Sequence, residues 1–288
     1  MMPREFGPSL RAVKRQSHRF TSMIPIRSAL LLFVATATPL LAQPTDTVYA
    51  DIGSSAIDGR FMKPHAARVR IYRGDSLVQQ WLNELTVGDS AGRPVMRWVT
   101  TSEAVPMNPN RPLSVLRQTY DAQTLAPMGF SSTVSNGAFT SLTINGKHVR
   151  GRRRTASDTT VIPVDITVDR PGYYSGASDL VPIAAGLRAG TVMVAPLWSP
   201  NSATAEYRVF VTHGDTTVNV EGTPVRAVKV DERHRSDRVL VATWYLLRES
   251  PYMVYGEVPL PDGRVQRMTE VEVPLKRKDN RPEHRDRQ

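Results

Sequence analysis

The side chains that most often carry catalysis occur in this chain, but not at the spacings that known catalytic motifs require. There is no His-Glu-x-x-His run, no phosphate-binding Walker loop and no dinucleotide-binding glycine fingerprint. The stretch 172–176 (GYYSG) places its serine one position away from that of a nucleophile elbow. The best remaining set for nucleophilic chemistry is Ser175 with Asp179 and His213, so a secreted hydrolase with a dispersed site stays open as an alternative.

Metal and cofactor chemistry finds equally little support in the sequence. The chain has no cysteine, which excludes disulfides, thiolate metal sites and a cysteine nucleophile. A zinc site built from His65, His148 and His213 lacks the paired spacing that zinc motifs show, so histidines near turns and exposed to solvent are the favoured interpretation. We therefore predict no catalytic residue, metal or cofactor, and favour a protein that is not an enzyme.

Aromatic residues are the best candidates for a binding surface. Buried rings usually pack the core of a β protein, whereas rings that line a concave sheet would hold an apolar ligand. The sequence leaves both roles open for them. The candidate ligand-binding residues, all in or beside expected strands, are Trp81, Trp98, Trp198, Tyr207, Trp244 and Tyr245.

The positive charge of the chain lies mainly at its two ends. The formal net charge is +10, but residues 1–42 carry six Lys or Arg and one acid, and residues 276–288 carry six bases and three acids. This leaves a net charge of +2 for residues 43–275, so nucleic acid is not an expected partner. The run 150–154 (RGRRR) either meets lipid headgroups or phosphates, or forms an exposed charged strand that discourages edge-to-edge pairing.

Residues 1–42 have the pattern of a secretory signal peptide. A basic stretch precedes the apolar run Ala29–Ala35, and Ala42 is the expected last residue before cleavage. A translation start at Met23 would give a signal of ordinary length. The apolar run is shorter than the ~20 residues of a membrane-spanning helix, so we expect no transmembrane segment in the processed chain. The expected location is the periplasm, the periphery of the outer membrane or the extracellular space.

After the leader, short runs alternate apolar and polar residues, which indicates strands with one buried face. Turn residues separate the runs, at 74–75, 135–137, 145–146, 213–215 and 261–263. The expected strands are 67–73, 76–88, 94–103, 113–121, 128–135, 207–212, 217–221, 225–230, 239–247, 253–258 and 265–273. One short helix is expected at 178–187. We predict a mainly β chain, with a strongly curved antiparallel sheet or incomplete β-barrel.

The expected organisation is a signal peptide at 1–42, one β domain at 43–275 and a basic disordered tail at 276–288. Two short echoes, 72–78 with 212–218 and 120–130 with 245–255, suggest that the β domain is built from two similar meanders. Ordinary hairpin chemistry produces the same echoes without duplication, so both explanations stay open.

The region from about Gly172 to Val273 resembles a bacterial family of exported proteins known only as a domain of unknown function. The resemblance rests on the segments 178–180 (SDL), 207–222, 225–230, 243–245 (TWY) and 250–254 (SPYMV). It implies a curved antiparallel sheet similar to the incomplete barrels of periplasmic lipid and lipoprotein carriers, and an envelope role with an apolar ligand. No catalytic residue comes with the resemblance. The chain departs from the pattern in its short helix and in the charges Arg248 and Glu249.

Together these features predict a noncatalytic, exported β protein of the cell envelope that binds a lipid or other amphiphile in a concavity of its sheet. A secreted hydrolase is one alternative. Another is a structural or adaptor protein whose basic tail binds an acidic partner.

Overall fold

A computed structural model describes residues 47–200 and 202–275, all of which belong to the unit Gln43–Gln288. The signal peptide predicted at 1–42 and the basic tail predicted at 276–288 lie outside the described residues. Within the described residues, no helix is long and apolar enough to cross a membrane.

The described chain is mainly β, and its strands form one large open sheet that does not close into a barrel. The first run of antiparallel strands, each paired with the next, is β2 (His65–Arg73), β3 (Ser76–Ser90), β4 (Arg93–Glu103), β5 (Ser114–Asp121), β6 (Pro127–Val134), β7 (Phe139–Asn145), β8 (His148–Arg154) and β9 (Ile162–Thr167). The second run is β11 (Val192–Trp198), β12 (Ala205–Val220), β13 (Thr223–His234), β14 (Leu240–Leu246), β15 (Met253–Pro259) and β16 (Val265–Val273).

Pairing between β16 and β2 joins the two runs into a single sheet. The two strands are antiparallel, from the pair Gln266 and Arg73 to the pair Val273 and Ala66. Two short strands, β1 (Thr47–Tyr49) and β10 (Tyr173–Tyr174), instead run parallel to β11. The sheet is therefore antiparallel except beside β11.

The predicted fold class is confirmed, and most predicted strands and turns lie close to their expected places. The strands of the first run that were expected at 67–135 are found within two residues of their predicted ends. The turns predicted at 74–75, 135–137, 145–146 and 261–263 all connect neighbouring strands. The expected helix at 178–187 is shorter: a 3-10 turn η1 (Ser175–Ala177) is followed by α1 (Leu180–Ala184).

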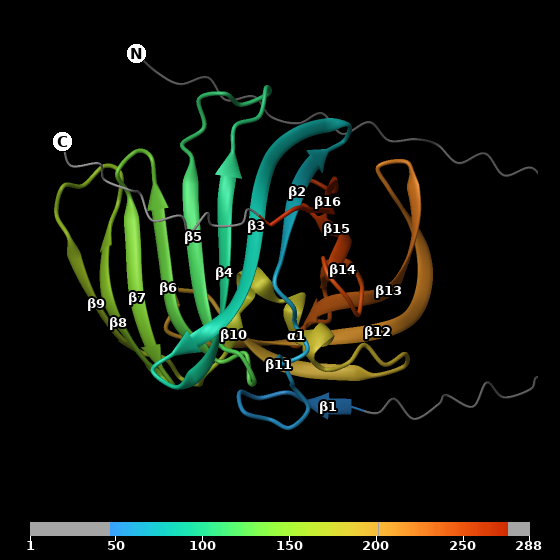
Figure 1. The fold of residues 1–288 in the computed structure, drawn as a ribbon, viewed down its shortest axis with the longest axis horizontal. Helices are drawn as coiled ribbons and strands as arrows, with labels where there is room; N and C mark the ends of the chain where they lie inside the picture. The colour runs from blue at the N-terminus through green and yellow to red at the C-terminus, as the bar shows by residue number, and fades with distance from the viewer. Residues whose placement is uncertain (1–46, 201, 276–288) are drawn as a thin grey trace, which may run out of the picture. The chain divides into compact units, whose positions relative to one another are not determined.

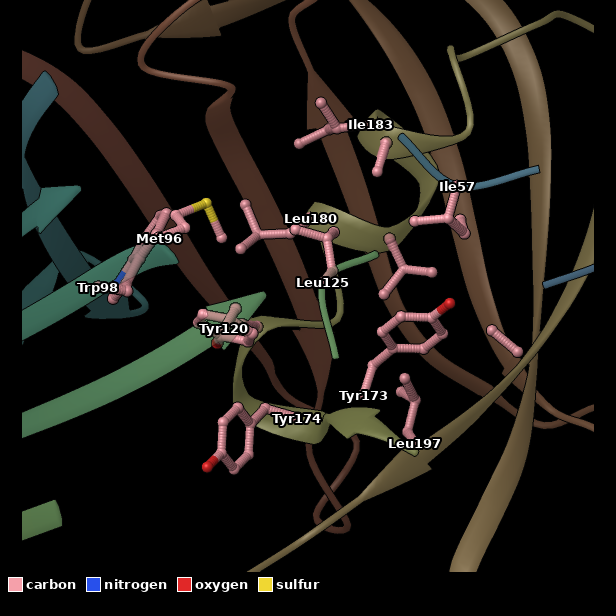
Figure 2. Packing of buried hydrophobic residues seen from close by; sticks show 14 of the residues in the cluster. Ile57, Met96, Trp98, Tyr120, Leu125, Tyr173, Tyr174, Leu180, Ile183 and Leu197 are labelled. Carbon is pink, nitrogen blue, oxygen red and sulfur yellow. The ribbon is translucent and has the colours of Figure 1, made fainter. Parts of the chain in front are cut away.

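The main hydrophobic core lies on one face of the sheet, which we call the inner face. Side chains from β4, β5 and β10 meet α1 there, and Figure 2 shows the packing of residues that include Met96, Tyr120, Tyr174 and Leu180. Alternation along each strand sends the remaining side chains to the opposite, outer face. On β16, for example, Met268 is part of the core cluster while its neighbour Arg267 is not.

The turn predicted at 213–215 is wrong. β12 runs without interruption from Ala205 to Val220, and a register shift between Thr212 and Gly214 marks a bulge there. The hairpin instead turns at Glu221 and Gly222. A bulge accommodates one extra residue and bends its strand, so a Gly-Asp pair inside a strand imitates a turn in the sequence.

Candidate functional site

The hairpin of β12 and β13 is much longer than the strands beside it, and its tip folds over the outer face of the sheet. β12 has 16 residues, whereas β14 and β15 have seven each. Figure 1 shows the long hairpin curving up beside β14, β15 and β16. Val220 and Ala227 of the hairpin form a second hydrophobic cluster with Val254 of β15, against which Tyr245 and Tyr255 pack.

Glu221 at the tip of this hairpin is held by side chains of β2 and β16. Arg70 Nη1 donates to Glu221 Oε2 at 2.5 Å, and Thr269 Oγ1 donates to Glu221 Oε1 at 3.0 Å. Tyr72 Oη makes a longer contact of 3.5 Å with the same carboxylate. Glu221 has a φ of +50°, a left-handed conformation that is unfavourable for a residue with a β-carbon. The three contacts offset this cost and fix the tip against the sheet.

An open groove of about 760 Å³ lies between the hairpin tip and the outer face of the sheet, within the size range of small-molecule sites. Its walls come from β2, β12, β14, β15 and β16 and from the turns of the β2–β3 and β12–β13 hairpins. The lining residues are Arg70, Tyr72, Asp75, Val218, Asn219, Glu221, Gly222, Tyr245, Tyr255, Glu257, Arg267 and Thr269.

Four of the five charged side chains in the groove form two ion pairs. Arg70 pairs with Glu221, and Arg267 Nη2 lies 3.1 Å from Asp75 Oδ1. Partial burial alone would raise the pKa of Glu221, but the hydrogen bonds from Arg70 and Thr269 and the charge of Arg70 lower it. Three carboxylates face two arginines, so the groove suits a neutral or zwitterionic group better than a free anion.

Two tyrosines of the groove, Tyr245 and Tyr255, have raised pKa values and stay protonated at physiological pH. Burial, followed by the charge of Glu257, raises the pKa of Tyr255 to about 12, and its hydroxyl donates to Glu257 Oε1 at 3.1 Å. Burial also raises the pKa of Tyr245. The rings of Tyr245 and Tyr255 meet edge to face at 5.4 Å, so each leaves part of its apolar surface facing the groove.

The six aromatic residues predicted to bind a ligand are not brought together. Of these, only Tyr245 lines the groove. Trp98 and Trp198 are buried in the main core, and Trp81 and Trp244 pack against it from the inner face.

Trp244 packs on the inner face of the sheet and does not face the groove. A β-carbon at Gly256, its cross-strand partner, would lie 2.9 Å from the indole, so glycine lets the ring lie flat on β15. Its Nε1 donates to Glu232 Oε2 at 3.0 Å. This residue therefore packs β15 and satisfies a buried carboxylate.

Tyr207 lies on the surface in a stack with two arginines. The guanidinium of Arg170 is 4.9 Å from the ring centroid and that of Arg235 is 5.0 Å from it. The hydroxyl donates to Asp51 Oδ1 at 3.3 Å. Because two guanidinium groups already stack on its ring, Tyr207 is less available for a ligand than Tyr245.

Sequence reasoning missed most of the groove, including Arg70, Glu221 and Thr269. These residues look like ordinary exposed positions of strands and turns. The available signal was the Glu221-Gly222 pair at the end of an alternating run, which is compatible with a two-residue hairpin turn. The expected strands at 217–221 and 225–230 place the connection at 222–224 and so leave Glu221 inside a strand instead of in the turn.

Three carboxylic acids lie near one another at the inner face. Glu232 accepts hydrogen bonds from Ser178 Oγ at 2.8 Å and from Trp244, yet burial raises its pKa. Burial, reinforced by the charge of Glu232, raises the pKa of Asp179 to about 7. Burial and then the charge of Asp179 raise the pKa of Glu270, whose Oε1 has no hydrogen-bond partner.

The dispersed hydrolase set is not assembled. Ser175 is exposed in η1, and Asp179 lies just before α1. His213 Nε2 instead contacts Asp231 on the outer face at 3.1 Å. Over residues 47–200 and 202–275, no three His, Asp or Glu side chains are grouped so that they could hold a metal ion.

Comparison of the chain with family models, with curated proteins and with solved structures gives no match.

Replacing Glu221 with Gln should loosen the hairpin tip, because the substitution removes the carboxylate charge that Arg70 binds. We expect a loss of about 1 kcal/mol in stability, since the pair is partly exposed. Amide hydrogen exchange of residues 216–226 should become faster. In the natural chain, the Glu221 carboxylate should protect these amides from exchange fully above the ordinary glutamate pKa of 4.5. This protection should be lost as the pH falls through the lowered pKa of Glu221.

Asp262→Asn is the matched control, because Asp262 is a carboxylate that binds an arginine, Arg264, within the β15–β16 turn rather than at the hairpin tip. Its hairpin exchange should equal that of the natural chain. Equal exchange in Glu221→Gln would contradict the role given to this carboxylate.

Replacing Glu270 with Gln should flatten the dependence of stability on pH. A carboxyl whose pKa is raised on folding binds its proton more tightly in the folded state, so stability falls as the pH rises above the unfolded pKa. The slope approaches about 1.4 kcal/mol per pH unit for each such group. Denaturant unfolding between pH 5 and 8 measures it.

Glu272→Gln, two residues further along β16 at an exposed position, should keep the natural slope. A natural chain that becomes more stable as the pH rises from 5 to 8 would contradict the assignment of the buried acids.

Proposed function

We propose that this chain is a noncatalytic, exported protein of the cell envelope that binds an amphiphile in the groove beneath the β12–β13 hairpin. The observation that carries the proposal is that tyrosine rings and paired charges share the walls of one open cavity of about 760 Å³. Sites for small ligands combine apolar walls with a few placed polar groups in this way. The leader sequence supports export.

The groove offers separate surfaces to the two parts of an amphiphile. The rings of Tyr245 and Tyr255, with Val218, provide apolar surface beside the second hydrophobic cluster. Arg267 and Glu257 provide a donor and an acceptor for a polar headgroup. Because the arginines already have carboxylate partners, the preferred headgroup is uncharged or zwitterionic.

The proposed groove lies on the outer face of the sheet, because the inner face is filled by the main core. Bulky side chains of β4, β5, β10 and α1 occupy the inner face where they form the main core, and Tyr173, Tyr174 and Leu180 are almost completely buried there. The groove requires no displacement of these residues.

Tyr245→Ala should weaken binding of an apolar probe by about tenfold, because burial of one aromatic ring stabilises a complex by about 1.5 kcal/mol or more. Tyr207→Ala is the control: it removes the same kind of side chain from outside the groove. Titration with the uncharged fluorophore N-phenyl-1-naphthylamine measures affinity, and native mass spectrometry after mild extraction from envelope membranes identifies bound amphiphiles. The proposal would be overturned if the natural chain carried no bound amphiphile and took up no probe. Equal affinities of the two folded variants would also overturn it.

A further inference from the structure

The outer face of β4–β8 carries arginines on both sides of a strip of short side chains. In one row of cross-strand neighbours, Arg117 of β5 and Arg152 of β8 are separated by Ser131 and Ser141. In the adjacent row, Arg97 and Arg150 are separated by Thr119, Gly129 and Thr143. Strands are ~4.8 Å apart, so the Arg117 and Arg152 backbones are separated by about 14 Å. The strip between them is a shallow trough floored by β6 and β7.

Arginines along β8 form one wall of this trough. Arg150, Arg152 and Arg154 alternate along the strand, which places them on the same face about 6.8 Å apart. The guanidinium groups of Arg152 and Arg154 lie over the ring of Phe139 on β7, at 5.8 and 5.4 Å from its centroid. This stacking holds both groups towards the trough. At one end, Thr143, Asn145, His148 and Arg150 line a hollow of about 360 Å³.

Most of this positive charge is unpaired. Arg97, Arg117 and Arg152 are exposed and form no ion pair with any acidic residue that the structure describes. Arg150 lies 3.4 Å from Asp165, but both side chains are largely exposed, so the pair is weak. Residues 43–275 as a whole carry a net charge of only +2, so these cations are concentrated on one face.

Protection of a sheet edge does not explain the arginines. β9 pairs with β8 along its length and is itself the edge strand at this end of the sheet. The cations therefore lie one strand inside the edge and project from the face of the sheet. Protection of the edge is instead supplied by β9 itself, which carries Pro163 and the exposed Asp165.

The shape and chemistry of the trough favour a linear polyanion over a bilayer or a nucleic acid. None of the exposed large hydrophobic side chains in the described chain belongs to β5–β8, whereas insertion into a membrane surface needs such residues. Single-stranded nucleic acids need free aromatic faces for stacking, but Phe139 is covered by its arginines. Hydroxyl groups on the floor are instead suited to hydrogen bonds with sugars.

We propose that the outer face of β5–β8 binds an extended acidic polysaccharide in the trough between Arg117 and Arg152. The two arginines hold its anionic groups, and Ser131 and Ser141 bind its hydroxyl groups. This site is separate from the groove beneath the β12–β13 hairpin and does not depend on it.

The test compares the full processed chain with a double variant, Arg117→Ser with Arg152→Ser. Polygalacturonate and heparin are the acidic probes and dextran is the neutral one, with affinity measured by titration at low and raised ionic strength. We expect the acidic probes to bind the natural chain in a salt-sensitive manner and dextran to bind negligibly. The double variant should bind the acidic probes about tenfold more weakly.

The matched control is Arg153→Ser with Arg188→Ser, which removes the same charge. Arg153 neighbours Arg152 but projects to the inner face, where it lines a hollow with Leu142 and Val164. Equal weakening in both double variants would overturn the proposal, because net charge alone would then explain binding. If the serine variant does not fold by circular dichroism, Arg117→Gln with Arg152→Gln replaces it. Tighter binding to phosphatidylglycerol vesicles or to single-stranded DNA than to polygalacturonate would also overturn it.

Discussion

The antiparallel pairing of β16 with β2 is the constraint on which the candidate site depends. It joins strands that lie almost 200 residues apart in the chain and makes one sheet of two consecutive runs. The same pairing places Arg70 directly opposite Thr269, and these two side chains bind Glu221 at the hairpin tip. Without this register the tip would have no partner and the groove would lack a wall.

Strand alternation lets the sheet carry different chemistry on its two faces. On β16, Thr269 lines the groove and binds Glu221, while the next residue, Glu270, is buried at the inner face. On β8, Arg152 faces the trough while Arg153 faces the other way. A shift of one residue in register would exchange these roles, so the surface sites and the core constrain each other.

Local features of the fold could be predicted from the sequence, whereas features that depend on distant pairing could not. The Asn145-Gly146 turn is encoded by its own residues, because glycine there adopts a positive φ of 59°. The parallel pairing of β1 with β11 has no local signature. Tyr245 is a candidate ligand-binding residue from its type and its place in an expected strand, whereas Glu221 gains its role only from β2 and β16. The bulge at Gly214 resembles a turn in the sequence, which divides β12 into two expected strands.

The candidate site exists only if the β12–β13 tip rests on the outer face of β2 and β16. The chain has no cysteine, so spin labels can be attached at two exposed positions, Thr223→Cys at the hairpin tip and Ser76→Cys at the start of β3. Double electron–electron resonance then measures the distance between the labels. A tip held on the sheet should give one narrow population of short distances in the otherwise natural chain. A broad distribution, or a single long distance, would contradict this placement of the tip.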